Sequence, residues 1–413
     1  MPSAADRMAF VDAHRGVAVL LMILWHAVDA WATQAARTGA AWDLLRLLGG
    51  LAAPSFLFLA GVAVSLRAAA DDRRGRPAVA TIRALVLRGL EVGLVGYAMR
   101  CPTWLFDRSG VLTPATLAPA ILIAAGLTAS FVAIRRVERA WREGVGWLVG
   151  GLGLVVVGYV WFAAVDVDRA ARATRADVLH AIGLSIAILS ALVAGARLLH
   201  RPWTLLLTAL GCTLATPALA EAIPQHWPAP LVGLLVRVPE HTSVPGAPLF
   251  PLFPWIAYAM AGAAFGARWA TSKDAIGWST LVPTAALGAA VAALGSEWLE
   301  PTRALLAEQP WLVPTVRWAH RVGWTLCLAL LSFGALARVR WLATLGRSSL
   351  LVYVVHLELT YGSGGQWLTD RLDLPVALLG FAMVTFAMVG LAALRQGPVE
   401  RWLAARRRAA SSA

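Results

Sequence analysis

The feature that most constrains this chain is a long series of apolar blocks separated by short polar breaks. Each block is about 17 to 22 residues long, and a helix of that length, rising 1.5 Å per residue, crosses a hydrocarbon layer of ~30 Å. Hydrophobic residues make up 59% of the sequence and charged residues 14%. An ordinary soluble domain is roughly half apolar and a quarter charged. We therefore expect an all-α, polytopic transmembrane helical bundle.

The apolar blocks predict about twelve spans, with ten as the lower bound. The spans are expected near residues 14–31, 47–66, 84–100, 115–134, 145–165, 178–196, 203–220, 251–267, 276–296, 318–337, 348–362 and 375–394. The pattern contains neither a fixed repeat nor a stretch typical of a soluble domain. One transmembrane domain over residues 1–413 is therefore expected.

The basic residues predict how the chain lies in the lipid bilayer. The formal net charge of +13 comes almost entirely from arginine, since Lys273 is the only lysine. These residues form short runs between apolar blocks, a pattern typical of contact with anionic lipids and not of nucleic-acid binding. Twelve spans put both termini on one side, and roughly two thirds of the basic residues fall on that side. This predicts that both termini lie in the cytoplasm, and we expect the membrane to be a bacterial inner membrane.

The first apolar block carries ionisable side chains, which are costly inside a membrane and therefore mark functional candidates. Arg15 and His26 are eleven residues apart, or three helical turns plus about 20°, so they share one face ~16 Å apart. Asp12 and Asp29 each lie three residues from one of them, within side-chain reach. An Asp beside a His can fix its tautomer and stabilise the imidazolium. The pattern indicates a base with an orienting carboxylate, while snorkelling of Arg15 and an interhelical hydrogen bond of His26 are the structural alternatives.

A second polar stripe lies in the eleventh predicted span. It consists of Ser349, Tyr353, His356 and Thr360, at intervals of four, three and four residues. This spacing places the four side chains along one helix face. Such a face needs a polar neighbour or a cavity, and interhelical hydrogen bonding is the structural alternative.

Two further segments contribute candidates. Asp177 and His180, three residues apart, open the sixth predicted span, and Trp255 lies at the start of the eighth. The three cysteines have no CxxC or Cys/His spacing, so no metal site is predicted.

Five blocks, in this order, resemble a known family. They are Val11-Asp-Ala-His-Arg-Gly-Val-Ala-Val-Leu-Leu-Met-Ile-Leu-Trp-His26, Pro54-Ser-Phe-Leu-Phe-Leu-Ala-Gly61, Arg175-Ala-Asp-Val-Leu-His-Ala-Ile-Gly183, Pro251-Leu-Phe-Pro-Trp255 and Leu345-Gly-Arg-Ser-Ser-Leu-Leu-Val-Tyr-Val-Val-His356. Together they resemble the heparan-α-glucosaminide N-acetyltransferase-like family of integral-membrane acyltransferases. The spacing of Arg15 and His26 is also similar to that of membrane O-acyltransferases that decorate surface polysaccharides. Lysosomal members differ, with Asn at the position of His26 and a functional His at that of Arg37.

The resemblance implies an enzyme that moves an acetyl or other short acyl group from cytoplasmic acyl-CoA to a hydroxyl or amino group of a sugar or glycan on the outer face. It implies acetyl-CoA or another acyl-CoA as donor, with no metal. The expected catalytic residues are His26 and Asp29, and the expected donor-binding residues are Arg15 and Arg347. The expected substrate pocket consists of Asp12, Asp177, His180, Trp255, Tyr353 and His356.

The sequence leaves three questions open: the role of His26 in the reaction, the class of function, and the oligomeric state. His26 can act as a general base, or it can carry the acyl group as a covalent intermediate. The alternative function is a proton-coupled transporter or flippase for a glycan or small anion, which intramembrane His and Asp residues would also suit. No matching pair of Pro- or Gly-broken spans recurs in the two halves of the chain, so we favour the acyltransferase. A homodimer stays open as well.

Overall fold

A computed structural model describes residues 4–99, 113–137, 141–167, 175–223, 227, 229–236, 249–271, 278–296, 299–362 and 364–399. Every regular element in these ranges is a helix, and only an isolated bridge between Ala32 and Leu372 has β character. The all-α prediction is confirmed. The chain divides into two compact units. Unit 1 comprises Met1–Leu59, Lys273–Thr302 and Ala319–Ala413, and unit 2 comprises Ala60–Ser272 and Arg303–Trp318. The expected single domain over residues 1–413 stays a prediction.

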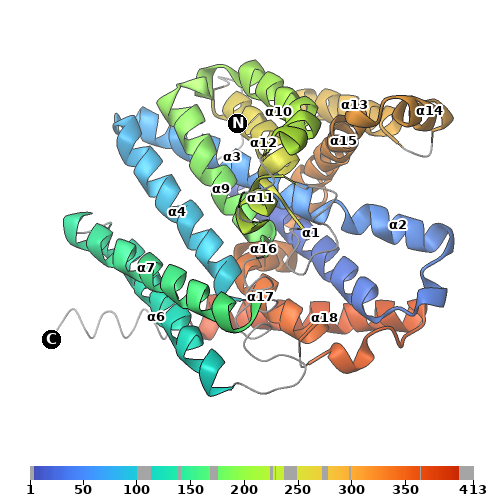
Figure 1. Cartoon of the computed structure of the whole chain (residues 1–413). Helices are drawn as coiled ribbons and strands as arrows, with labels where there is room; N and C mark the ends of the chain where they lie inside the picture. The colour runs from blue at the N-terminus through green and yellow to red at the C-terminus, as the bar shows by residue number, and fades with distance from the viewer. Residues whose placement is uncertain are drawn as a thin grey trace. The chain divides into compact units, whose positions relative to one another are not determined.

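Unit 1 contains the first and last helices of the chain (Figure 1). Its elements are α1 (Ala4–Trp31), η1 (Gln34–Ala36), α2 (Gly39–Gly49), α13 (Trp278–Leu294), η6 (Leu336–Arg338), α16 (Arg340–Arg347), α17 (Ser349–Thr360), η7 (Gln366–Leu368), α18 (Leu374–Leu394) and η8 (Arg395–Val399). Three helices run from one unit into the other: α3 (Ala52–Arg73), α14 (Glu300–Glu308) and α15 (Val313–Phe333).

Helix α1 is the centre of unit 1 and packs against α2, α16, α17 and α18 (Figure 1). It crosses α16 at very close range. A Cβ atom added to Gly346 would lie 1.9 Å from the Asp12 carbonyl oxygen, and one added to Gly16 would lie 2.1 Å from that of Leu342. Only glycine permits this approach of two backbones. The crossing brings Arg347, the residue after Gly346, next to Asp12.

Helices α16 and α17 form a bent pair with an angle of 85° between them. The prediction of a single span over 348–362 did not anticipate this bend, which falls at Ser348 between the two helices. The Ser348 hydroxyl accepts a hydrogen bond from the Gln396 amide at 2.7 Å, and the same amide donates to the Thr344 carbonyl at 2.8 Å. The segment after α18 therefore stabilises the bend.

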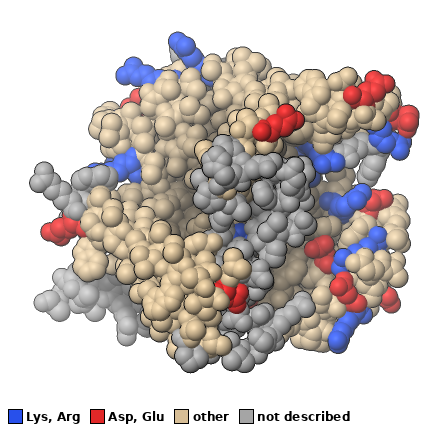
Figure 2. Space-filling model, viewed as in Figure 1, with Lys and Arg blue, Asp and Glu red and all other residues tan. Residues whose placement is uncertain are grey.

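Unit 2 is built from helices in the middle of the chain. They are α4 (Ala78–Ala98), α6 (Pro114–Val137), α7 (Trp141–Val165), α9 (Val178–Ser190), η2 (Ala191–Gly195), η3 (Leu198–His200), α10 (Pro202–Ala222), α11 (Ala229–Leu235), α12 (Leu252–Thr271) and η5 (Pro310–Leu312). Helix α4 packs on α9, α6 on α7, and α10 on α12. Figure 2 shows few charged side chains over α6 and α7 on the face drawn, and the exposed side chains of α7 include Trp147, Val156 and Val160. Such a surface is suited to lipid and not to water.

Within the described residues, seven helices are long and apolar enough to cross a membrane, or eight if the bent pair α16/α17 counts as one span. The other predicted spans, near 84–100, 251–267, 276–296 and 318–337, overlap with helices α4, α12, α13 and α15. Helix α13 is only 17 residues long, and α4 carries Arg83, Arg88 and Glu91. The prediction of about twelve spans is therefore not confirmed, whereas long apolar helices typical of an integral membrane protein are present.

Candidate functional site

Helix α1 carries the four ionisable residues that the sequence singles out, Asp12, Arg15, His26 and Asp29. The helix is continuous from Ala4 to Trp31, so the eleven residues between Arg15 and His26 correspond to ~16 Å along its axis. Asp12 lies near the Arg15 end and Asp29 near the His26 end. The two ends of this helix have different neighbours within unit 1.

At the His26 end, a second histidine completes a pair. The Nδ1 atom of His26 lies 2.8 Å from the Nε2 atom of His356 on α17. The two rings are nearly parallel, with 6° between their planes and 5.1 Å between their centroids. His356 is fully buried, while His26 is partly exposed. His356, one of the four residues of the second polar stripe, thus contacts His26, the predicted base.

The hydrogen bonds of this pair assign its protons. The Nδ1 atom of His356 lies 2.9 Å from the Val352 carbonyl oxygen, and a carbonyl oxygen only accepts, so this Nδ1 carries the hydrogen. In neutral His356, Nε2 is then an acceptor, and Nδ1–H of His26 donates to it. Neutral His26 therefore has its lone pair on Nε2, the arrangement that a general base needs.

Asp29, three residues after His26 on α1, accepts a hydrogen bond from a tyrosine. The Tyr361 hydroxyl donates to Oδ2 of Asp29 at 3.2 Å. The ring of Tyr361 meets the ring of His26 edge to face, with 5.5 Å between centroids. Arg37 donates to the Asp29 carbonyl oxygen at 2.8 Å and to the Asp370 carboxylate at 2.5 Å. The carboxylate predicted to orient His26 thus contacts Tyr361, whose ring packs on His26, and its orienting role stays a prediction.

Two other residues of the α17 stripe, Tyr353 and Thr360, are buried beside His356, whereas Ser349 is partly exposed. Tyr353 meets His356 edge to face, with 5.7 Å between centroids, and the Thr360 hydroxyl donates to the His356 carbonyl oxygen at 2.9 Å. Tyr353, His356 and Thr360 are all buried. The spacing thus corresponds to a polar face that is buried at Tyr353, His356 and Thr360, and His356 brings this face into contact with His26 of α1.

At the Arg15 end, two arginines meet on one carboxylate. Asp12 lies 3.7 Å from a guanidinium nitrogen of Arg15 and 3.7 Å from one of Arg347. The Arg15 and Arg347 side chains are 29% and 50% exposed, against 12% for Asp12. The Nε atom of Arg347 also donates to Oε1 of Gln396 at 2.9 Å. The structure therefore brings together the two predicted donor-binding residues, Arg15 and Arg347. Their two positive charges exceed the one negative charge of Asp12, and both arginine side chains are partly exposed.

The three predicted residues in unit 2 have local partners there. The Asp177 carboxylate accepts a hydrogen bond from the Val178 N–H at 2.6 Å, and Nδ1 of His180 accepts one from the Asp177 N–H at 2.9 Å. This is a capping box that starts α9. Trp255 packs against Phe250 and Tyr258. These contacts account for the local geometry, and a role in the substrate pocket stays a prediction for all three.

Sequence reasoning missed two residues of the site, Tyr361 and Gln396. Tyr361 directly follows the stripe but is off its face, and Gln396 follows the last apolar block with no motif around it. Arg37 was noted only as a departure from the lysosomal pattern. A search for polar residues at the ends of apolar blocks would have returned all three, together with many others.

One comparison with known proteins gives a match. The family profile "heparan-alpha-glucosaminide N-acetyltransferase, catalytic" matches residues 7–300. The range contains Arg15, His26 and the capping box of α9, and ends before Arg347 and His356. Searches of curated proteins and of solved structures found no match. Because the profile covers well over half of the chain, the protein belongs to the heparan-alpha-glucosaminide N-acetyltransferase family.

Proposed function

We propose that this protein is a transmembrane acyltransferase that moves an acetyl or other short acyl group from cytoplasmic acyl-CoA to a hydroxyl or amino group of a sugar on the opposite face. Family membership supports the acetyl-transfer chemistry. The observation that carries the proposal is the hydrogen bond between His26 and His356. It leaves Nε2 of His26 as the basic nitrogen, on the same helix face as Arg15.

The Arg15 end is suited to the donor. Coenzyme A carries several phosphate charges, and the planar guanidinium group of arginine is the preferred partner of phosphate. A phosphate would compete with the Asp12 carboxylate for Arg15 and Arg347, which are both partly exposed. The pantetheine arm would then lie along the ~16 Å of α1 between Arg15 and His26.

The His26 end is suited to the transfer step. Nε2 of His26 takes the proton of the acceptor hydroxyl or amine as its oxygen or nitrogen attacks the thioester carbonyl carbon. The new ester or amide bond forms, the carbon–sulfur bond breaks, and the proton passes from His26 to the departing thiolate, which leaves as free CoA. During this step Nδ1–H of His26 stays bonded to His356, which stabilises the imidazolium form. We place Asp29 in a positioning role through Tyr361.

The remaining predicted residues belong to the acceptor side of the proposal. We propose acceptor contacts for Asp177, His180 and Trp255 in unit 2, and separately for Tyr353 and His356 in unit 1. The proposal treats the chain as one catalytic domain in a bacterial inner membrane, with both termini in the cytoplasm. The excess of basic residues in the loops of that side supports the orientation.

Acceptor-dependent CoA release tests the proposal. The purified protein in lipid nanodiscs is incubated with radiolabelled acetyl-CoA and a panel of glycans, and both free thiol and label on the glycan are measured. We expect equal amounts of CoA released and acetyl group transferred. If no acceptor yields CoA, and the protein in proteoliposomes instead accumulates a labelled glycan under a pH gradient, the transporter alternative replaces the acyltransferase.

Sidedness has a separate test. Single cysteines introduced at 70–78 are expected to react with a membrane-impermeant thiol reagent only after the cells are opened, whereas cysteines in 221–250 are expected to react from outside. The reverse pattern would exchange the donor and acceptor faces.

A further inference from the structure

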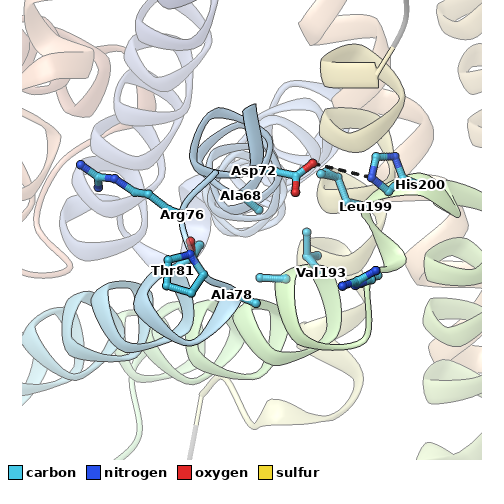
Figure 3. Close-up of a pocket in the computed structure, with 11 residues that line it drawn as sticks. Ala68, Asp72, Arg76, Ala78, Thr81, Val193, Leu199 and His200 are labelled. Atoms are coloured by element: carbon cyan, nitrogen blue, oxygen red, sulfur yellow. Dashed lines mark ion pairs between the residues drawn. The ribbon is translucent and has the colours of Figure 1, made fainter. Parts of the chain in front are cut away.

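A cavity of about 330 Å³ opens in unit 2, and its lining includes neither the histidine pair nor Arg15 and Arg347 (Figure 3). It lies where α3 ends, α4 begins and η2 is followed by η3. Its buried wall includes Ala68, Val193 and Leu199, whereas its charged lining residues are exposed. The charged residues are Asp72, Arg76, Arg197 and His200. A small apolar wall with a charged rim is a suitable site for an amphipathic ligand.

The charges on the rim are not all neutralised by one another. His200 lies 3.9 Å from the Asp72 carboxylate, and Figure 3 shows this pair on one side of the cavity with Arg76 on the other. Arg76 lies 3.5 Å from the buried Asp71, which also bonds to Arg67. The Arg197 side chain makes no hydrogen bond or ion pair with any residue in the described part of the chain. Arg197 is thus a cation available to a ligand.

The backbone at Arg197 gives a second reason to regard its side chain as functional. Its φ of 55° and ψ of 28° fall in the left-handed region, at the junction between η2 and η3. Glycine adopts this region without cost and other residues rarely do. A non-glycine residue held in this conformation on the rim of a cavity is a candidate for a functional role.

The start of α4 adds a third feature that favours an anion. Pro77 and Ala78 line the cavity, and α4 begins there with no side-chain cap. The amino end of a helix carries partial positive charge from its unbonded N–H groups. Together with Arg197, it provides two sources of positive potential around the cavity.

Exposed apolar residues beside the cavity identify the source of the anion. Val79 in the first turn of α4 is 75% exposed, and Trp203 in the first turn of α10, three residues after His200, is 74% exposed. Tryptophan is enriched at the membrane interface, where the phosphate groups of lipids lie. We propose that the cavity binds the phosphate group of an anionic phospholipid. Basic pockets between helix ends at the membrane surface hold lipid headgroups in the same way.

The test measures lipid affinity of the full chain in detergent by native mass spectrometry, with phosphatidylglycerol and phosphatidylcholine as probes. The variant is Arg197→Gly, because glycine fits the left-handed backbone and the variant should fold. The matched control is Arg74→Ala, which removes an equal charge from an exposed residue outside the cavity lining. We expect Arg197→Gly to bind phosphatidylglycerol at least tenfold more weakly, with the control and the phosphatidylcholine affinity unchanged.

A second arm separates a lipid from a soluble phosphate. Lipid-depleted protein is heated with inorganic phosphate or with phosphatidylglycerol, and the midpoint of unfolding is recorded. Protection by the lipid alone supports the proposal, and protection by inorganic phosphate to the same extent overturns the lipid as source. Equal phosphatidylglycerol affinity in Arg197→Gly and Arg74→Ala overturns the site. Neither result bears on acyl transfer, which uses other residues.

Discussion

Two His–Asp pairs with the same three-residue spacing have different surroundings in this protein. In unit 1, His26 bonds to His356 on another helix and Asp29 bonds to Tyr361. In unit 2, Asp177 and His180 bond to the backbone at the start of their own helix. The backbone N–H groups around His26 already have helical partners, whereas those of a first turn have none and attract nearby side chains. Spacing thus predicts proximity, and position along the helix decides which partner is available.

The largest expected effect is that of replacing His26, and it is not expected for His180. His26→Ala removes the proposed base, and general-base catalysis contributes about 10²- to 10⁴-fold, so we expect kcat for acetyl transfer to fall by that factor. The affinity for CoA should remain, because Arg15 and Arg347 are ~16 Å away along α1. Release of CoA in a steady-state assay and CoA binding by calorimetry give the two measurements.

His180→Ala is the matching variant in unit 2. It removes one half of the capping box and a proposed contact with the acceptor, so we expect a slightly lower unfolding temperature and a raised KM for the acceptor, with kcat per folded molecule nearly normal. An unchanged KM for the acceptor would leave His180 as a cap only, and a loss of kcat as large as that of His26→Ala would end the contrast between the two pairs.

The second effect is at the other end of α1. Arg15→Lys keeps the charge but loses the two-pronged contact with phosphate, and Arg15→Ala loses both, so CoA affinity should fall in two steps. A hydrogen bond to a charged group contributes about 1.5–3 kcal/mol, which corresponds to roughly ten- to over a hundredfold in affinity for the alanine variant. Calorimetric titration of CoA measures both. Were Arg15 only a membrane anchor, Arg15→Lys would be silent, since either side chain reaches the interface.

The third expected effect concerns His356, the hydrogen-bond partner of His26. His356→Ala removes the acceptor of the His26 Nδ1–H, and one neutral hydrogen bond of about 1 kcal/mol corresponds to about fivefold in kcat. The KM for acetyl-CoA should not change. His356→Gln offers an amide oxygen as acceptor and should recover part of the loss. A merely structural role would lower the amount of folded protein in both variants and leave kcat per folded molecule as it was.

The sequence could predict features that depend on one helix and not those that depend on long-range packing. The shared face of Arg15 and His26 follows from helical periodicity alone, and α1 is continuous as expected. The pairing of His26 with His356 joins residues 330 positions apart, and no local pattern specifies it. The bend at Ser348 depends on Gln396, which lies after the last span. The number of spans was the least predictable feature. Helix α4, for example, forms as a long helix but carries three charged residues, which makes it less typical of a membrane span.

The smallest effect concerns the carboxylate of the second pair. Asp177 caps α9, and replacing a capping Asp by Ala costs about 0.5–2 kcal/mol of stability, so Asp177→Ala should lower the free energy of unfolding by that amount. Serine caps a helix nearly as well as aspartate, so Asp177→Ser should restore most of the stability. Serine carries no charge, however, and could not replace a carboxylate that binds the acceptor sugar. Unfolding and turnover measured on both variants therefore separate the two roles. If Asp177→Ser regains stability and turnover together, the residue acts only as a cap; if it regains stability but transfers acyl groups poorly, Asp177 acts in the substrate pocket as well, and the two His–Asp pairs are more alike than their hydrogen bonds indicate.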